Sequence, residues 1–121
     1  MCGIFALLNF SKFYYNKTII NNLFMKGQKR GPENTQIIYV PEINNQVALG
    51  FHRLAINGYK NPLSEQPINL KNCMLICNGE IYNYKHLHEK IGIKCETFSD
   101  CEIIIHLYRE FGIEYTLQLL D

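Results

Sequence analysis

An apolar run directly follows the first methionine, with the sequence CGIFALLNF at residues 2 to 10. The run is too short for an amphipathic helix that stands alone, and its residues are apolar on both faces of an extended chain. This pattern predicts a buried strand at the start of the chain. A sheet must therefore form around the N-terminal residues, and Cys2 lies at the beginning of that strand.

Composition indicates one folded domain. The 121 residues are 47% hydrophobic and 12% aromatic, which is enough for a core. Twelve Lys and Arg against eleven Asp and Glu give a net charge of +1, with KGQKR at 26–30 as the one dense basic stretch, so we expect no nucleic-acid binding. The apolar start has no basic flank and soon meets polar residues, which favours neither a signal peptide nor a membrane span. We expect a soluble, cytoplasmic protein.

Strands and loops follow from turn residues and apolar runs. Residues 35–40 (TQIIYV) and 46–51 (QVALGF) are predicted strands, and the turn-rich PEINN between them favours an antiparallel hairpin. GYKNPLSEQP at 58–67 is a predicted loop, and NCMLIC at 72–77 is another predicted strand.

Three helices are predicted. The first begins near Lys17 and ends near the RGP at 30–32, and the second runs from about Tyr84 to Ile91. The clearest covers residues 100–112, where Ser99 and Glu102 have capping-box spacing. The expected apolar faces are Ile20, Leu23 and Phe24 on the first helix and Ile104, Leu107, Tyr108 and Phe111 on the last.

The five cysteines make an odd number without a Cys-x-x-Cys pair, so free thiols are expected. Cys2 differs from the others by its position. Removal of Met1 would give it both a thiol and a free α-amine, and an α-amine titrates at about 7.7 to 8.0, close enough to neutrality to accept and return a proton. Alternatively, Cys2 has no catalytic role and occupies this position by chance or for packing.

Asn78 and Gly79 follow the predicted strand at 72–77 and allow two interpretations. An Asn-Gly pair is typical of a type I′ hairpin turn. The following EIYN, however, resembles a helix entry more than a return strand. An Asn side-chain amide beside a Gly backbone N–H can instead present two donors to one oxyanion.

Arg53 and Asp100 offer opposite charges. Arg53 either lies on a solvated strand face or uses its planar guanidinium to bind a carboxylate through two hydrogen bonds. Asp100 is either a first-turn acid of the last helix or a partner for a ligand ammonium. Together they could hold the head of a free amino acid.

Six stretches carry a resemblance that spans residues 1 to about 112: MCGIF, KRGPE, FHRLAI, EQPI, CNGEIYN and SDCEIIIHLY. In this order they resemble the glutaminase domain of class II, N-terminal-nucleophile glutamine amidotransferases, most closely that of glutamine-dependent asparagine synthetases. The resemblance implies an α+β fold over residues 1–121, an Ntn-hydrolase-type sandwich of two antiparallel sheets flanked by helices. It implies hydrolysis of L-glutamine to glutamate and ammonia, which serves amide synthesis on another domain or chain.

The resemblance also implies residue roles. Cys2 would be the nucleophile with its own amine as base, and Asn78 and Gly79 would form the oxyanion hole. Substrate binding would involve Asn78 and Gly79 again, together with Arg53 on the carboxylate, Asp100 on the ammonium, the backbone near Leu54 and Ile56, and the acid at Glu80. No cofactor is expected in this domain, because ATP and magnesium would belong to a synthetase domain that these residues do not include.

The sequence departs from the family pattern in two places. The family usually has Asp after RGP and soon afterwards a glycine, whereas this chain has Glu33 and no glycine through Gln36, so we expect a reshaped loop. The family's domain continues beyond the LLD at 119–121. We therefore expect a C-terminally truncated domain that exposes apolar surface, or a synthetase subunit or other chain that completes the sheet.

The sequence allows two other interpretations. One is an inactive remnant, or a regulatory module that binds an amino acid. The other is a metal site drawn from Cys73, Cys77, Cys95, Cys101, His52, His86, His88 and His106. Cys73 and Cys77 share a face of a predicted strand but lie too far apart to bind one ion easily, so we expect no metal site. His86 and His88 are expected on a polar helix surface, and His106 on or beside a packed face.

Overall fold

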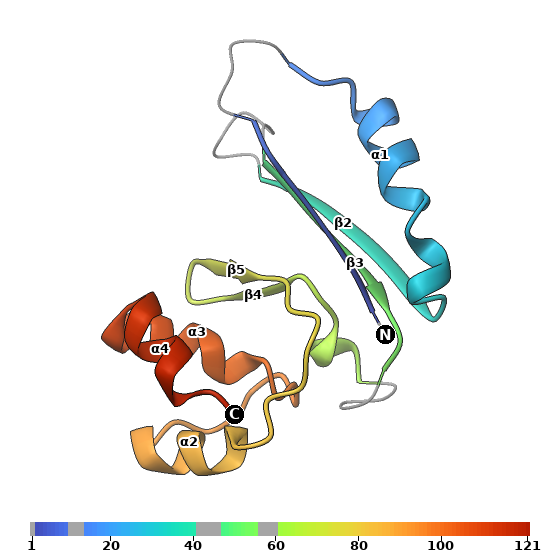
Figure 1. Ribbon diagram of the computed structural model, residues 1–121. Coiled ribbons are helices and arrows are strands. Elements are labelled where there is room, and N and C mark those ends of the chain that lie inside the picture. Colours follow the sequence, from blue (N-terminus) through green and yellow to red (C-terminus); the bar gives the residue numbers. More distant parts are fainter. Residues whose placement is uncertain (1, 10–13, 41–46, 56–60) are drawn as a thin grey trace. The chain divides into compact units, whose positions relative to one another are not determined.

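The computed structural model describes residues 2–9, 14–40, 47–55 and 61–121. The chain forms two compact units, Met1–Ala55 and Ile56–Asp121, and each is described by itself. The described residues contain a three-stranded and a two-stranded sheet, both antiparallel, and four α-helices (Figure 1). The predicted α+β class with two antiparallel sheets is confirmed. The face-to-face packing of these sheets stays a prediction.

The first unit is built on a sheet with the order β1-β3-β2. The strands are β1 (Gly3–Leu8), β2 (Asn34–Val40) and β3 (Val47–Arg53). The predicted antiparallel pairing of β2 with β3 is confirmed, while its PEINN turn lies outside the described residues. β3 continues two residues beyond the predicted end, because His52 and Arg53 pair with neighbouring strands.

Helix α1 (Lys17–Met25) packs on one face of this sheet through Phe24. The Phe24 ring stacks on the His52 ring, with 4.1 Å between the ring centroids. A Cβ on Gly50 would lie 2.6 Å from the Phe24 ring, so this strand position requires glycine. His52 is buried, with Nε2 2.9 Å from the Phe24 carbonyl oxygen and Nδ1 3.0 Å from the Thr35 hydroxyl. The predicted helix is shorter than expected, and a 3₁₀ turn at Gln28–Arg30 follows it.

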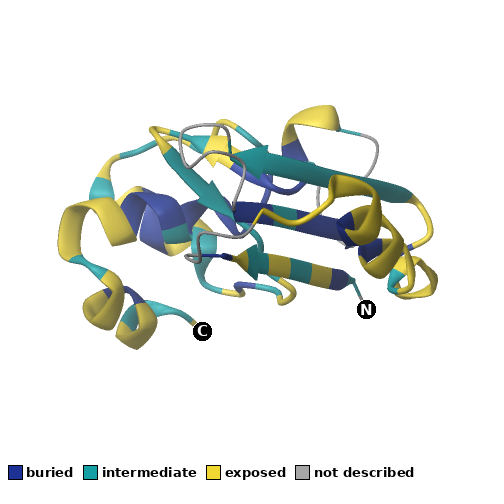
Figure 2. Cartoon of the chain, turned by 90° about the horizontal axis from the view of Figure 1, so that it is seen from above, coloured by how far each residue is buried: buried dark blue, intermediate teal, exposed yellow. Residues whose placement is uncertain are grey.

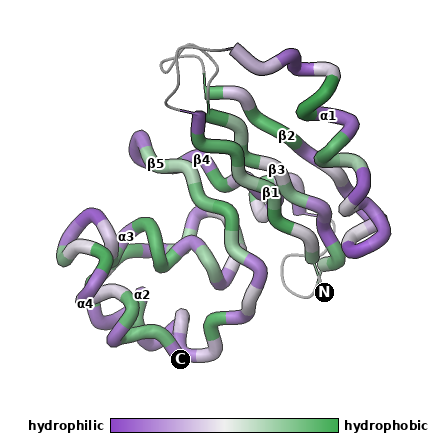
Figure 3. The backbone as a smooth tube through the Cα atoms, turned by 45° about the horizontal axis from the view of Figure 1, so that its top comes forward, coloured by the Kyte–Doolittle hydropathy of each residue, from purple (hydrophilic) through white to green (hydrophobic). Residues whose placement is uncertain are grey.

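Burial of β1 on both faces was predicted and is wrong for this unit. The strand alternates: Phe5 faces α1, whereas Ile4 is 55% and Leu8 61% exposed. Figure 2 shows the alternation as teal and yellow bands along the strand beside the N label. Figure 3 shows that the strand is nevertheless largely hydrophobic, so the face away from α1 is apolar and uncovered within its own unit.

The second unit contains a hairpin that the sequence did not reveal. Strand β4 (Ile68–Leu70) pairs with β5 (Cys73–Leu75). Lys71 and Asn72 join them with φ angles of 51° and 61°, the left-handed pair that a tight hairpin needs. The predicted loop before it contains a 3₁₀ turn at Pro62–Ser64.

Three helices complete this unit. Helix α2 (Tyr84–Ile91) has the predicted bounds, and α3 (Glu102–Phe111) lies inside the predicted range. Helix α4 (Ile113–Leu119) was not predicted. None of the helices in the described part of the chain has the length and apolar character needed to cross a membrane.

Helix α3 supplies most of the core of the second unit. Ile103 and Leu107 pack with Ile81 and Leu87, while Ile105 packs with Ile68 of β4. The expected apolar face was wrong in part, since Tyr108 and Phe111 are exposed and Leu107 alone of its members is fully buried.

The predicted capping box is also wrong. The Glu102 carboxylate accepts hydrogen bonds from the amides of Glu96 and Thr97 and lies 3.0 Å from His106 Nε2. Burial by itself would raise the pKa of Glu102, but these hydrogen bonds outweigh it and lower the pKa to about 2. Glu102 is therefore a buried, ionised group that orders the loop before α3.

Candidate active site

The Cys2 thiol lies against the backbone beyond the end of β3. It donates to the Leu54 carbonyl oxygen at 3.2 Å, and the Leu54 amide donates to its Sγ at 3.3 Å. Arg30 Nε donates to the Cys2 carbonyl oxygen at 3.2 Å. These contacts hold both the backbone and the side chain of Cys2, so a nucleophile here starts from a defined position.

Cys2 and Arg53 lie on the same side of the sheet. Gly3 pairs with His52, so the register continued by one residue places Cys2 opposite Arg53. Opposite residues of an antiparallel pair share a face. Because His52 points toward α1, Cys2 and Arg53 lie on the other face. Arg53 is nearly buried, which fits a positioned guanidinium better than the alternative of a solvated one.

The loop after α1 closes over the end of β3. The Glu33 amide donates to the Arg53 carbonyl oxygen at 3.1 Å, and the Ala55 amide donates to Glu33 Oε2 at 2.8 Å. A Cβ on Gly31 would lie 2.2 Å from the His52 carbonyl oxygen, so only glycine permits this approach. Glu33, the residue that departs from the family pattern, therefore fixes the segment that follows Arg53. Ile56, also predicted to bind substrate, lies outside the described residues.

Asn78 and Gly79 are exposed and do not form the type I′ turn that was the alternative. Neither has the positive φ that such a turn requires. The residues on both sides are held: Gln66 binds the peptide groups of Cys77, and the Ile81 amide donates to Asp100 Oδ2 at 2.7 Å. A Cβ on Gly79 would meet one atom, Cys77 Sγ at 3.8 Å, so the space beside this backbone is open.

Asp100 is buried and lies before α3 rather than in its first turn, because the N-cap is Cys101. Its Oδ2 atom accepts the Ile81 amide, which ties it to the same segment as Asn78 and Gly79. Glu80 is half-buried within that segment. The second unit thus gathers four of the predicted site residues at one place, and the first unit gathers Cys2, Arg53 and Leu54.

Cys77 and Cys101 lie beside this segment and shift each other's pKa. The neighbouring Cys101 thiol lowers the pKa of Cys77 to about 7, whereas Cys77 and burial raise the pKa of Cys101. Each of the five cysteines, all among the described residues, is free, as expected.

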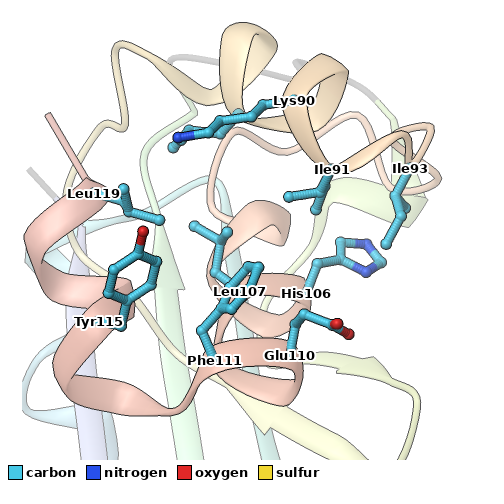
Figure 4. A pocket seen from close by; sticks show the side chains of 10 residues that line it. Lys90, Ile91, Ile93, His106, Leu107, Glu110, Phe111, Tyr115 and Leu119 are labelled. Carbon is cyan, nitrogen blue, oxygen red and sulfur yellow. The ribbon is translucent and has the colours of Figure 1, made fainter.

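A separate pocket of about 280 Å³ opens among α2, α3 and α4 (Figure 4). Its lining is largely apolar, with Leu87, Ile91, Leu107 and Phe111 among its residues. None of the predicted site residues lines it. This pocket is therefore distinct from the predicted glutamine site.

Sequence reasoning missed the residues that hold the site. Gln66 and Arg30 occur in the quoted stretches EQPI and KRGPE, but no role was assigned to either. Their position inside family stretches was the available signal. The structure shows that they fix the backbone at Cys77 and Cys2, respectively.

Known proteins share this pattern over the whole chain. The glutamine amidotransferase domain family matches residues 1–121, and the chain belongs to that family. It is 38% identical over 124 residues to the glutamine-hydrolyzing asparagine synthetase of Gallus gallus and 37% identical over 124 residues to a probable one of Acanthamoeba polyphaga mimivirus. It is 38% identical over 125 residues to the asparagine synthetase of Homo sapiens.

These alignments cover 100% of this chain but 21%, 22% and 21% of the three relatives, in the same order. The chain therefore spans about a fifth of the length of the curated relatives it matches. The family resemblance predicted from the six stretches is confirmed. The individual roles of the site residues stay predictions.

Proposed function

We propose that this chain is the glutamine-hydrolysing domain of an asparagine-synthetase-like amidotransferase. The observation that carries the proposal is the Cys2 thiol, fixed by both backbone groups of Leu54 on the sheet face that Arg53 shares. Family membership over residues 1–121 supports it. The alternative, an inactive module that binds an amino acid, gives no reason for these contacts to the thiol.

The proposed nucleophile forms when Met1 is removed. The α-amine of Cys2 then accepts the thiol proton, and the resulting thiolate attacks the side-chain amide carbon of glutamine. The Leu54 amide, which already donates to Sγ, would stabilise the thiolate. No distant histidine is needed as a base.

Acyl transfer then proceeds in two steps. Attack produces a tetrahedral oxyanion, to which the Asn78 side-chain amide and the Gly79 N–H would donate. The C–N bond breaks, the α-amine returns its proton to the leaving nitrogen, and ammonia departs from a thioester on Cys2. Water hydrolyses the thioester, which releases glutamate and restores the thiol.

Substrate recognition in this proposal uses charges and backbone groups. Arg53 pairs with the glutamine carboxylate through two parallel hydrogen bonds, and Asp100 pairs with the ammonium. Leu54, Ile56 and Glu80 complete the contacts. Leu54 can serve both thiol and substrate, because a carbonyl oxygen accepts two hydrogen bonds.

The ammonia would pass to a synthetase domain or subunit that makes an amide, as the names of the relatives suggest. ATP and magnesium belong to that part, and the glutaminase reaction itself uses neither. The proposed location is cytoplasmic. No nucleic-acid or membrane partner is part of the proposal.

The test combines mass and turnover on the purified chain. Intact mass should show loss of Met1, and a glutamine-analogue electrophile should add one adduct that maps to Cys2. The same protein should release glutamate from glutamine. Cys2→Ala should abolish both, whereas Cys73→Ala, which removes another half-buried thiol, should keep both.

A processed and folded chain that gains no adduct would favour the inactive module. Glutamine binding measured by calorimetry then separates an amino-acid-binding module from a remnant without a site. Circular dichroism of Cys2→Ala checks that loss of activity is not loss of fold.

A further inference from the structure

The second unit brings together three side chains that no proposed catalytic step uses. His88 lies on α2, Cys95 in the segment between α2 and α3, and Glu102 at the start of α3. One nitrogen, sulfur or oxygen atom from each lies within 4.8 Å of the other two. We propose that His88, Cys95 and Glu102 bind a zinc ion.

His88 supplies the independent observation. The residue is 6% exposed, and its Nε2 atom is buried without a hydrogen-bond partner. Nδ1 lies 2.9 Å from the Ile93 carbonyl oxygen, which can only accept, so Nδ1 carries the proton. In a neutral imidazole Nε2 then holds a free lone pair. A buried acceptor without a donor is rare in native proteins, and a metal ion satisfies it.

The tautomer is the one that zinc requires. Metal-bound histidines usually donate their other ring N–H to a carbonyl or carboxylate, which fixes the ring and makes the ligating nitrogen more basic. The Ile93 carbonyl makes this contact with His88 before any metal is bound. The expected placement of His88 on a polar helix surface is wrong, whereas His86, two residues earlier, is exposed as predicted.

Cys95 and Glu102 face the same space. Cys95 Sγ lies 3.3 Å from Glu102 Oε2. Glu102 is fully buried, and the amides of Glu96 and Thr97 together with His106 hold its carboxylate in place. The carboxylate is thus fixed by the contacts that usually surround a metal ligand.

The chemistry of the set selects the metal. One thiolate, one imidazole and one carboxylate form a mixed S, N, O set, which suits zinc better than the all-oxygen cages of magnesium or calcium. Binding replaces the thiol proton, which is released to solvent, and forms Zn–S, Zn–N and Zn–O bonds. The two negative charges of Cys95 and Glu102 then balance the charge of Zn²⁺.

Zinc binding requires the three ligand atoms to move slightly closer together. Zinc bonds of about 2.0–2.3 Å in a tetrahedron place ligand atoms about 3.3–3.8 Å apart. The sulfur and the Glu102 oxygen already have that separation. The three ligand atoms lie within 4.8 Å of one another, so small side-chain shifts would complete the set, and Cys95 lies in a segment without regular structure. Three protein ligands leave a fourth position for water or another ligand.

The placement gives the ion a structural role. It would join α2, the segment around Cys95 and α3, three consecutive parts of the chain that have no regular structure in common. Glu102 stands two residues after Asp100. An ion at this place would therefore stabilise the start of α3, which directly follows the segment that contains Asp100 of the proposed glutamine site.

The first experiment uses the purified full chain, without a histidine tag and after treatment with a chelator. Titration with zinc chloride should show one ion per chain by native mass spectrometry. Cobalt should give a thiolate-to-cobalt charge-transfer band. Zinc should protect Cys95 from alkylation and leave Cys73, a half-buried thiol outside the set, reactive.

Matched variants test the ligands. His88→Leu should lose the stoichiometric zinc and the cobalt band, and His86→Leu on the exposed side of the same helix should keep both. Cys95→Ser should lose the charge-transfer band, and Cys73→Ser should keep it. His88→Leu removes the unsatisfied nitrogen but also the hydrogen bond from Nδ1 to the Ile93 carbonyl oxygen, so circular dichroism checks that this variant folds.

Three outcomes would overturn the proposal. They are a wild-type chain that binds less than one zinc ion, zinc binding that survives both His88→Leu and Cys95→Ser, and zinc that protects Cys2 in place of Cys95. The protection measurement uses the wild-type chain, so it decides the question even if a variant fails to fold. None of these readouts depends on glutamine turnover.

Discussion

The side-chain amide of Gln66 binds both peptide groups of Cys77. Gln66 Nε2 donates to the Cys77 carbonyl oxygen at 3.1 Å, and the Cys77 amide donates to Gln66 Oε1 at 2.6 Å. Cys77 directly precedes Asn78, so this double contact fixes where the proposed oxyanion donors begin. Gln66 is itself buried, and the pair therefore resembles a short stretch of sheet in which one partner is a side chain.

Gln66→Met keeps the size of the side chain and removes both hydrogen bonds. We expect a loss of about 1–3 kcal/mol in the free energy of unfolding, because a buried donor and acceptor lose their partner. Glutamine turnover should fall as well, since Asn78 and Gly79 would shift. Urea unfolding and a glutamate assay measure the two effects. Gln118→Met, the same change at an exposed position on α4, should alter neither, and equal stability of the two variants would contradict the prediction.

Asp100 combines a structural contact with a proposed substrate contact, and two variants separate them. Asp100→Asn keeps an oxygen that accepts the Ile81 amide but removes the charge, so it should fold and bind glutamine with a higher KM. Asp100→Ala loses the acceptor too and should also lose about 1–3 kcal/mol of stability. Steady-state kinetics and urea unfolding give the values. A folded Asp100→Asn with an unchanged KM would remove the proposed ammonium contact.

Glu33 tests the loop that departs from the family pattern. Its carboxylate accepts a hydrogen bond from the Ala55 amide, so Glu33→Ala should speed hydrogen exchange at Ala55. Glu33→Gln keeps an acceptor, so exchange at Ala55 should be slower in this variant than in Glu33→Ala. Exchange at single residues by NMR measures it. Glu114→Ala, at an exposed position on α4, serves as control. Ala55 exchange that is the same in Glu33→Ala and the wild type would show that the contact does not order this segment.

Cys77 should become reactive near neutral pH. The thiolate, not the thiol, is the nucleophile, so alkylation rises as pH increases through the pKa, which the Cys101 thiol lowers to about 7. Cys101→Ala removes the donor and should move the midpoint of iodoacetamide labelling to higher pH, while Cys101→Ser should keep much of the shift. Peptide mass spectrometry over a pH series reports each site. A midpoint that Cys101→Ala leaves in place would contradict an effect of Cys101 on the pKa of Cys77.

The sequence predicted those elements whose pattern is local. Helix α2 has its predicted bounds, and in the structure it ends at Gly92, which adopts the left-handed conformation typical of a helix C-terminus. The β2–β3 pairing follows from two apolar runs around a turn. Strand β4 was not predicted because it has only three residues and because Lys71 and Asn72, which form its turn, are not a common turn pair. Helix α4 was not predicted because Gly112 indicated the end of the preceding helix, although α4 begins at the next residue.

The candidate site residues were also predicted from local features. Residue chemistry and position singled out Cys2, Arg53, Asn78, Gly79 and Asp100, and the family stretches that contain them supported the same choice. His88 could not be predicted as buried, because its burial depends on α3, where the ring of His106 lies 5.6 Å from its own. Contacts between segments far apart in the chain leave little trace in local periodicity.

The pairing of β1 with β3 has a consequence for the order of events during synthesis. β1 has no other neighbour among the described strands, and Cys2 is separated from its contact at Leu54 by 52 residues. At ribosomal speeds of about 5–20 residues per second, the partner strand emerges about 3–10 seconds after the N-terminus. Throughout that interval the nascent end has no partner strand. If Cys2 is the proposed nucleophile, an aminopeptidase could therefore expose its amine before β1 pairs with β3.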